Sequence, residues 1–239
     1  MVKEALASNF TIKDFYATEE WAAKNHELIK KIDKLQIISP VELSRMSHQK
    51  TPNQALAVLK MTRQDIDYKV FQNDFVVALD HIQDPGNLGT IVRTCDWFGI
   101  KNLICSPDTA DIFNPKTIQS TMGAIFRVSV VYHSLESILK FCNENSLPVY
   151  GAVLNGENIY KQTLENKGLL IMGNESSGIN REILKNISQP LTIPGPPDGS
   201  GEMESLNVGI ATAVICSEFR RQKSLPASPM VSRGATPLI

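Results

Sequence analysis

Short apolar runs alternate with amphipathic stretches through residues 73–221. Residues 75–79, Phe-Val-Val-Ala-Leu, are continuously apolar, which is typical of a strand covered on both faces. Helical periodicity fills much of the sequence between such runs, and this alternation favours a mostly parallel, doubly wound α/β sheet. We expect strands at 75–79, 102–105, 128–132, 149–154, 169–172 and 191–193, and helices at 87–98, 134–143 and 205–221.

The first 70 residues are more polar and predict a separate small α/β domain. Charged residues at 63–68 indicate a linker, so we divide the chain into domains 1–70 and 71–223. Residues 224–239 contain three prolines among small residues, which predicts a tail that does not pack. In the first domain we expect helices at 3–8, 19–31 and from Pro40, and strands at 11–17, 34–39 and 55–61.

Composition narrows the class of protein. A hydrophobic content of 42% and a charged content of 21% are ordinary for a soluble globular protein. No run approaches the roughly 18 apolar residues of a membrane span, and the first residues lack a secretory signal, so we expect a cytoplasmic protein with no membrane partner. The cysteines lie far apart in apolar surroundings, which indicates buried thiols and no metal site. They are Cys95, Cys105, Cys142 and Cys216.

The net charge of −1 argues against a nucleic-acid partner, because affinity for a phosphate backbone comes largely from Lys and Arg. The distribution changes this only slightly, since residues 1–70 carry a net charge of +2 and the remainder −3. Charge alone does not suggest RNA.

Three segments carry polar residues at the ends of predicted strands, where ligands bind in open α/β sheets. The first segment, residues 80–93, runs from a strand through Pro85 and Gly86 into a helix whose expected N-cap is Asn87. Arg93 lies about 100° around the axis from Val92, and therefore points away from the apolar stripe. An ordinary capped helix with a solvated arginine explains this segment equally well.

The second segment, residues 169–180, is an apolar strand that opens into the loop Gly173-Asn174-Glu175-Ser176-Ser177-Gly178. The lysine that would follow the last glycine of a phosphate-binding loop is absent after Gly178. The Glu175 carboxylate would also repel a phosphate. Backbone groups with one carboxylate suit a neutral or cationic ligand better. An ordinary turn between strand and helix is the alternative.

The third segment, residues 193–208, is a loop ahead of a helix that we expect to begin at Ser205 as N-cap. That helix is apolar on more than one side, which is typical of a fully buried helix or a subunit interface. A buried C-terminal helix explains the apolar residues, but it does not explain why Ser205 and Asn207 cluster at the start.

Together and in this order, the three segments resemble the motifs of the SpoU (TrmH) family of the SPOUT superfamily. The resemblance covers residues 74–222 and rests on Asn87 with Arg93, on the loop 173–178, and on residues 193–208. Residues 1–70 are similar to the ribosomal-protein-like substrate-recognition domain of many members, in an N-terminally short form.

The resemblance implies an RNA 2′-O-ribose methyltransferase that uses S-adenosylmethionine, with ribosomal RNA favoured over tRNA. It also implies a homodimer and a deep trefoil knot over roughly residues 168–218, an exception to the rule that chains do not thread loops. The residues that match the family's catalytic positions are Arg93, Asn87, Glu175, Ser205 and Asn207. Those that match its cofactor-binding positions are Leu154, Gly173, Asn174, Gly178, Ile193 and Leu206.

In such a reaction the cofactor supplies an activated methyl group and the protein supplies alignment. The ribose hydroxyl is a poor nucleophile until its proton begins to leave. An arginine is normally locked as a cation, so we expect Arg93 to anchor an RNA phosphate and stabilise the developing alkoxide rather than act as a base. Ser205 and Asn207 are expected to orient the ribose and the cofactor carboxylate.

Three other functions fit the sequence less well. A non-catalytic RNA-binding or ribosome-assembly protein could keep the same fold, although the intact polar residues argue against it. A dinucleotide-dependent oxidoreductase needs a Gly-x-Gly-x-x-Gly turn, which residues 85–89 do not provide, and a GTPase needs the missing P-loop lysine.

Overall fold

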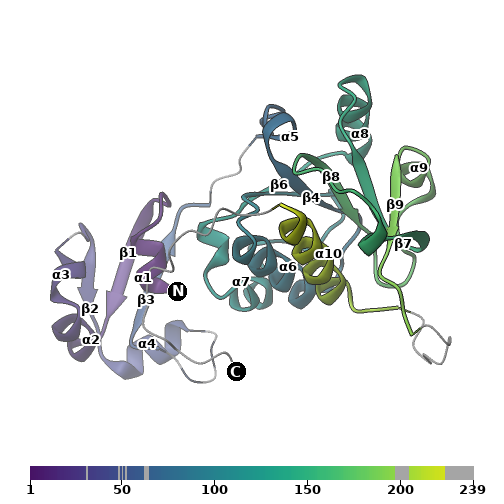
Figure 1. Ribbon diagram of the computed structural model, residues 1–239. Coiled ribbons are helices and arrows are strands. Elements are labelled where there is room, and N and C mark those ends of the chain that lie inside the picture. The colour runs from purple at the N-terminus through teal and green to yellow at the C-terminus, as the bar shows by residue number, and fades with distance from the viewer. Residues whose placement is uncertain are drawn as a thin grey trace.

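A computed structural model describes residues 1–30, 32–47, 49, 51, 53–61, 65–196 and 205–223. They form two sheets, each with its own helices (Figure 1). The tail expected at 224–239 lies outside the described residues. The boundary at residue 70 stays a prediction.

The N-terminal domain is built on a three-stranded mixed sheet of order β2-β1-β3. The central strand β1 (Ile12–Ala17) pairs in parallel with β2 (Leu35–Ile37) and antiparallel with β3 (Ala55–Leu59). Phe15 and Ala17 of β1 are fully buried in its small core. Its helices are α1 (Val2–Leu6), α2 (Glu19–Lys24), α3 (His26–Ile29) and α4 (Pro40–Met46).

The helix expected over 19–31 is interrupted. Helix α2 ends at Lys24, and Asn25 leaves helical geometry at φ −128° before α3 begins. The Asn25 side chain donates to the carbonyl of Trp21, so it competes with the backbone bond that would continue the helix. Helix α4 begins at Pro40 as predicted, with Ser39 and Glu42 forming a capping box.

The second domain contains a six-stranded sheet of order β6-β5-β4-β8-β7-β9, and every pairing in it is parallel. This confirms the predicted parallel α/β sheet. All ten residues of the central strands β4 and β8 are buried, as their apolar runs require. The strands are β4 (Phe75–Leu79), β5 (Asn102–Cys105), β6 (Ser129–Tyr132), β7 (Val149–Asn158), β8 (Gly168–Met172) and β9 (Gln189–Thr192).

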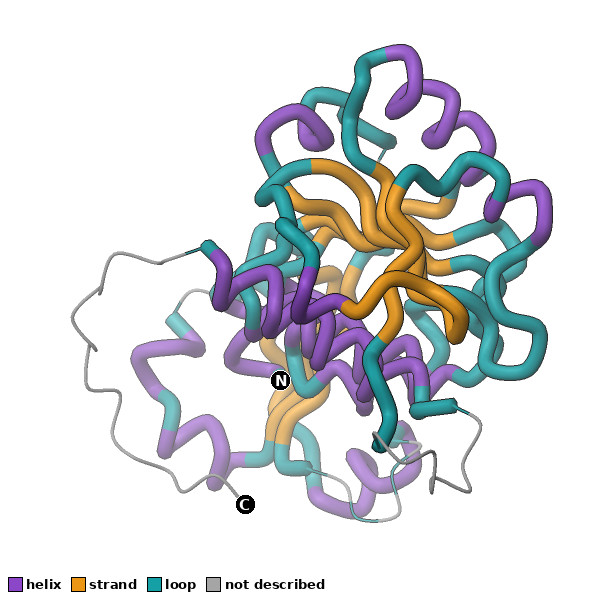
Figure 2. The backbone as a smooth tube through the Cα atoms, turned by 45° about the vertical axis from the view of Figure 1, so that its right-hand side comes forward, coloured by secondary structure: helices purple, strands orange, loops and turns teal. Residues whose placement is uncertain are grey.

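Helices cover both faces of this sheet, which Figure 2 shows as a central stack of strands between helical layers. Successive side chains of β4 point to opposite faces, so Val77 and Leu79 join one core and Val76 and Ala78 the other. One layer contains α6 (Pro85–Trp97), α7 (Pro115–Thr121) and α10 (Val208–Gln222). The other contains α5 (Val70–Asn73), α8 (Leu135–Glu144) and α9 (Arg181–Leu184). Two short 3₁₀ helices, η1 (Ala124–Phe126) and η2 (Ile159–Lys161), complete the domain.

Several boundaries differ from the sequence prediction. Strand β7 continues to Asn158 rather than residue 154, because its pairing with β9 resumes at Glu157 after an irregularity at Ala152. The last strand ends at Thr192, which leaves Ile193 in the following loop. Helices α5 and α7 were not predicted, since each spans only one or two turns, and α9 was expected after the second segment but without bounds. The expected knot runs through residues 197–204, outside the described residues, so the threading stays a prediction.

The cysteines are buried and free, as predicted. Burial raises the pKa of the Cys142 thiol to about 11 and that of Cys216 to about 12. Within the described ranges, no group of three or more His, Cys, Asp or Glu side chains could hold a metal ion. None of the described helices is both long and apolar enough to cross a membrane.

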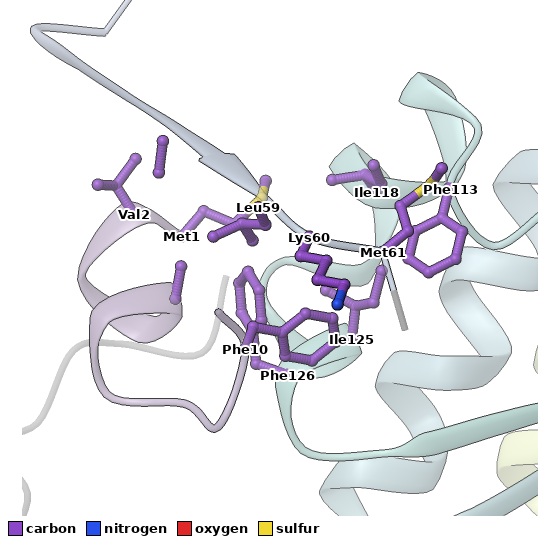
Figure 3. Close-up of a pocket in the computed structure, with 12 residues that line it drawn as sticks. Met1, Val2, Phe10, Leu59, Lys60, Met61, Phe113, Ile118, Ile125 and Phe126 are labelled. Carbon is purple, nitrogen blue, oxygen red and sulfur yellow. The ribbon is translucent and has the colours of Figure 1, made fainter. Parts of the chain in front are cut away.

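The two domains meet around an apolar cavity of about 310 Å³ (Figure 3). The rings of Phe10 and Phe126 close one side in an edge-to-face contact, with centroids 5.4 Å apart. Beside it, the Arg127 guanidinium contacts Glu4 of α1 at 3.1 Å and Asp96 of α6 at 2.7 Å. One arginine thereby links the N-terminal domain to α6, the helix that carries Asn87 and Arg93.

Candidate active site

The sheet register brings the first and second segments together. Leu79 of β4 pairs with Met172 of β8, so Asp80 and Gly173 leave the same edge of the sheet on adjacent strands. The Asp80 backbone N–H donates to the Met172 carbonyl at 2.9 Å. The carboxyl ends of parallel strands meet at one edge, which is where the predicted site lies.

Asn87 joins all three segments through its side-chain amide. Its Nδ2 donates to Glu175 Oε1 of the second segment at 2.6 Å. Its Oδ1 accepts a hydrogen bond from Asn207 Nδ2 of the third segment at 3.0 Å. The nitrogen and the oxygen of the Asn87 amide therefore each have a partner from a distant part of the chain. Three predicted site residues form one hydrogen-bonded row.

The first turn of α6 fixes where Asn87 can reach. The helix begins two residues earlier than predicted, with Pro85 at its first position, and Asp84 is the N-cap rather than Asn87. Asp84 Oδ1 accepts from the Asn87 backbone N–H at 2.9 Å. A hydrogen bond from Lys116, followed by that backbone bond, lowers the pKa of the Asp84 carboxyl. Because Asp84 provides the cap, the Asn87 side chain is free to bind Glu175 and Asn207.

Asn207 does cap a helix. The predicted N-cap Ser205 lies outside α10, which begins at Val208, because Asn207 Oδ1 accepts from the backbone N–H groups of Gly209 and Ile210. This use of Oδ1 leaves Nδ2 to donate to Asn87. Gly209 allows α10 to approach α6 closely, since a Cβ there would lie 3.0 Å from Thr90 Cγ2.

The loop of the second segment is tightly folded around its glycines and Asn174. A Cβ on Gly173 would lie 2.4 Å from the Gly178 carbonyl carbon, and Gly178 itself adopts φ +68°. The backbones of Asn174 and Gly178 exchange two hydrogen bonds of 2.9 Å. Asn174 Oδ1 accepts from the backbone N–H groups of Ser176 and Ser177. The closed loop presents the exposed Glu175 side chain towards Asn87.

Asp80 anchors the base of this loop. Its Oδ2 accepts from the Asn180 backbone N–H at 2.6 Å, and only 7% of the residue is exposed. Burial raises the pKa of the Asp80 carboxyl, and the bond from Asn180 partly offsets that effect. Asp80 was not among the predicted site residues, although its place directly after an apolar strand was a usable signal.

Arg93 lies six residues beyond Asn87 on α6, about 9 Å along the helix axis. Its side chain is exposed and has no hydrogen-bond or ion-pair partner among the described residues. The Arg127 guanidinium, by contrast, is bound by Asp96 and Glu4. Arg93 is therefore a cation available to an anionic ligand.

The remaining predicted residues lie around the same edge without joining the row of hydrogen bonds. Leu154 is 66% exposed in β7, Leu206 is 52% exposed before α10, and Ile193 is half-buried just after β9. Thr192 Oγ1 donates to the Leu154 carbonyl at 3.0 Å, which brings these two strand regions together. Ser205 is exposed and has no hydrogen-bond partner in the described part of the chain.

Comparison with known proteins matches residues 74–217 to the SpoU rRNA Methylase family. The chain belongs to this family. The match contains all three segments in full. It confirms both the resemblance and the predicted class of enzyme. A curated relative, the 23S rRNA (guanosine(2553)-2′-O)-methyltransferase RlmP of Bacillus subtilis, is 30% identical over 92% of this chain and 85% of its own length.

Two solved structures align with this chain across both domains. A TrmH-family protein from Porphyromonas gingivalis is 33% identical, with a TM-score of 0.80 over 92% of this chain and 86% of its own. An rRNA methyltransferase from Sinorhizobium meliloti, solved with AdoMet bound, is 25% identical with a TM-score of 0.80 over 92% and 84%. The small N-terminal domain is therefore part of the shared fold.

Proposed function

We propose that this SpoU-family chain transfers a methyl group from S-adenosylmethionine to a ribose 2′-hydroxyl of ribosomal RNA. The observation that carries the proposal is the row Glu175–Asn87–Asn207, which gathers three distant segments at one edge of the sheet. Relatives support the substrate: RlmP acts on a guanosine of 23S rRNA, and another relative, from Streptomyces viridochromogenes, acts on a uridine of 23S rRNA.

The loop 173–178 fits a bound S-adenosylmethionine. The missing side chain at Gly173 lets the loop close against Gly178, whereas Gly178 has open space beside its backbone that a ligand could occupy. The exposed Glu175 carboxylate, held by Asn87, would favour a cofactor whose sulfonium is cationic. When bound, the cofactor supplies an electrophilic methyl group. In this proposal the cofactor-binding residues are Leu154, Gly173, Asn174, Gly178, Ile193 and Leu206.

Arg93 is proposed to hold the RNA. A guanidinium binds a phosphate through two parallel hydrogen bonds, and this chain leaves that of Arg93 unpaired among the described residues. The same positive charge would stabilise negative charge that develops on the ribose oxygen as its proton passes to water. Asn87, Glu175, Ser205 and Asn207 orient the ribose and the cofactor around the reacting oxygen.

A homodimer completes this proposal. Large apolar side chains are exposed around the start of α10, where a monomer would leave them in water: Ile210 is 55% exposed, Leu206 52% and Leu154 66%. Tyr160 of η2, which contacts α10, is 51% exposed. A second copy of the chain is the occupant that buries these residues and places each Arg93 near a paired site.

The domain of residues 1–70 is proposed to bind RNA beside the active site. The Arg127 contacts to Glu4 and Asp96 support a defined position of this domain relative to α6. A cytoplasmic location remains part of the proposal.

Mapping 2′-O-methylated nucleotides in total RNA, with and without the gene, tests the function. Loss of one ribosomal RNA methylation in the deletion strain is expected, and it should return with the wild-type gene but not with Arg93→Ala. Calorimetry with S-adenosylmethionine separates this enzyme from a non-catalytic RNA-binding protein, which would show neither cofactor binding nor a lost modification.

A further inference from the structure

His81 stands at the junction of β4 and the first segment in an unusual backbone conformation. Its φ is +60°, in the left-handed region that side chains with a Cβ rarely adopt, and only Met122 and Ser146 share this among the described non-glycine residues. A residue persists there when its surroundings hold it.

Two polar residues that follow β5 hold His81. Ser106 Oγ accepts from the His81 backbone N–H at 2.9 Å, and the imidazole Nδ1 bonds to Asp108 Oδ2. Ser106 Oγ in turn donates to Asp108 Oδ1, which closes the three residues into a ring of hydrogen bonds. Both the main chain and the side chain of His81 are therefore tethered to one loop.

The other side of His81 faces the loop 173–178, here called the cofactor loop for its proposed role. Its carbonyl oxygen accepts from Asn174 Nδ2 at 2.8 Å, across 93 positions of sequence. That bond sets the orientation of the Asn174 amide, because the opposite end of the same amide accepts from Ser176 and Ser177. A more extended φ at His81 would move this carbonyl away from Asn174.

We propose that His81 is a positioning residue for the cofactor loop, acting through Asn174 and supported by Asp108 and Ser106. This inference rests on the proposed role of the loop 173–178 in binding S-adenosylmethionine. It adds a contribution from the loop after β5, which the three segments recognised in the sequence do not include.

The His81–Asp108 pair is exposed, so a positioning role can be distinguished from a contribution to the stability of the fold. The side chains of His81 and Asp108 are 38% and 57% exposed, and exposed pairs contribute little to folding. Removing the imidazole should therefore leave the fold intact and loosen the loop.

Calorimetric titration with S-adenosylmethionine, on the full chain, tests the proposal through three substitutions at His81. His81→Ala removes the tether while a Cβ still disfavours the left-handed backbone, and should weaken the affinity about five- to tenfold. His81→Asn should lose less, because Asn tolerates this conformation. His81→Gly should fall between them. The melting temperature without cofactor should stay close to wild type in all three.

His133 provides a matched control, since it also follows a strand of the same sheet, β6, which β5 separates from β4, and it has no hydrogen bond to Asn174. His133→Ala should bind the cofactor as the wild type does. On an Asn174→Ala background, His81→Ala should cause no further loss, because the imidazole is proposed to act only through the bond between the residue-81 carbonyl and Asn174.

Unchanged affinity in His81→Ala, or an equal further loss on the Asn174→Ala background, would overturn the positioning role. A wild-type chain that does not bind S-adenosylmethionine at all would instead contradict the proposed function. The Michaelis constant for RNA should not change in His81→Ala, and a rise in that constant alone would also overturn the inference.

Discussion

Asn207 and Asn87 lie 120 positions apart in the sequence, and a hydrogen bond of 3.0 Å joins their side-chain amides. The bond runs from the N-cap of one helix to the first turn of another. Asn207 also caps α10, and Asn87 also binds Glu175 of the second segment. Neither residue can therefore move without disturbing a further contact. This contact makes the start of α10 part of the site that α6 and the second segment form.

Substitutions at Asn207 can separate the capping of α10 from catalysis. Asn207→Asp keeps an oxygen for the N–H groups of Gly209 and Ile210 but cannot donate to Asn87, so we expect near-normal stability and reduced methyl transfer. Asn207→Ala should lose both functions, with about 1 kcal/mol less unfolding free energy. Urea unfolding and initial rates measure the two effects, and equal activity in Asn207→Asp and wild type would rule out the contact with Asn87 as a requirement.

Glu175 should distinguish a cationic cofactor from a neutral one. Glu175→Gln keeps an oxygen that can accept from Asn87 but removes the negative charge, so the affinity for S-adenosylmethionine should fall about tenfold. Affinity for S-adenosylhomocysteine, which lacks the sulfonium charge, should change much less. Equal losses for the two ligands in calorimetry would argue against an electrostatic role for this carboxylate.

Gly173 and Gly178 form a matched pair of substitutions. A methyl group at Gly173 meets the backbone of Gly178 at 2.4 Å, whereas a methyl group at Gly178 meets nothing within 4 Å. Gly178→Ala therefore has only its left-handed φ to overcome, at about 1 kcal/mol. We expect cofactor affinity to fall further in Gly173→Ala, and the opposite order would contradict the described loop.

The buried thiols should resist alkylation in the native protein. Burial raises the pKa of Cys216 to about 12 and of Cys142 to about 11, and the thiolate is the reactive form. At pH 8 the folded chain should react slowly with iodoacetamide, and all four cysteines should react after unfolding in urea. Rapid labelling of Cys216 in the folded protein would show that α10 is not packed as described.

Substitution of Arg127 should affect RNA binding more than cofactor binding. Arg127→Met removes the contacts to Glu4 and Asp96, which are partly exposed and contribute less than about 1 kcal/mol to stability. The expected result is an increased Michaelis constant for RNA with unchanged affinity for S-adenosylmethionine. Lys185→Met, which breaks an exposed pair on α9, serves as the control.

The sequence predicts the fold well where a strand is buried on both of its faces. The boundaries of β4 match the prediction at both ends, because five apolar residues in succession leave little choice of structure. The start of α10 was wrong by three residues, since Ser205 and Asn207 are both good N-caps and only the packing of α10 on α6 selects between them. Short helices such as α5 have too little periodicity to be recognised.

The residues of the site were largely recognisable, but their contacts were not. Asn87, Glu175 and Asn207 could be selected because they match positions of the SpoU motifs. Nothing in the local pattern shows that Asn87 bridges the other two, or that Asp84 caps α6 in its place. The His81 carbonyl bond to Asn174 depends on a left-handed backbone, which no periodicity reveals.

Methyl transfer by Arg93→Ala tests the proposed reaction most directly. Purified wild type and variant, each with tritiated S-adenosylmethionine and unmodified ribosomal RNA, should bind the cofactor equally. Wild type should label a ribose 2′-oxygen, and the variant should be slower by roughly 10²–10³-fold. Near-normal turnover in Arg93→Ala, or label on a base rather than a ribose, would contradict the role of Arg93 and of the site around it.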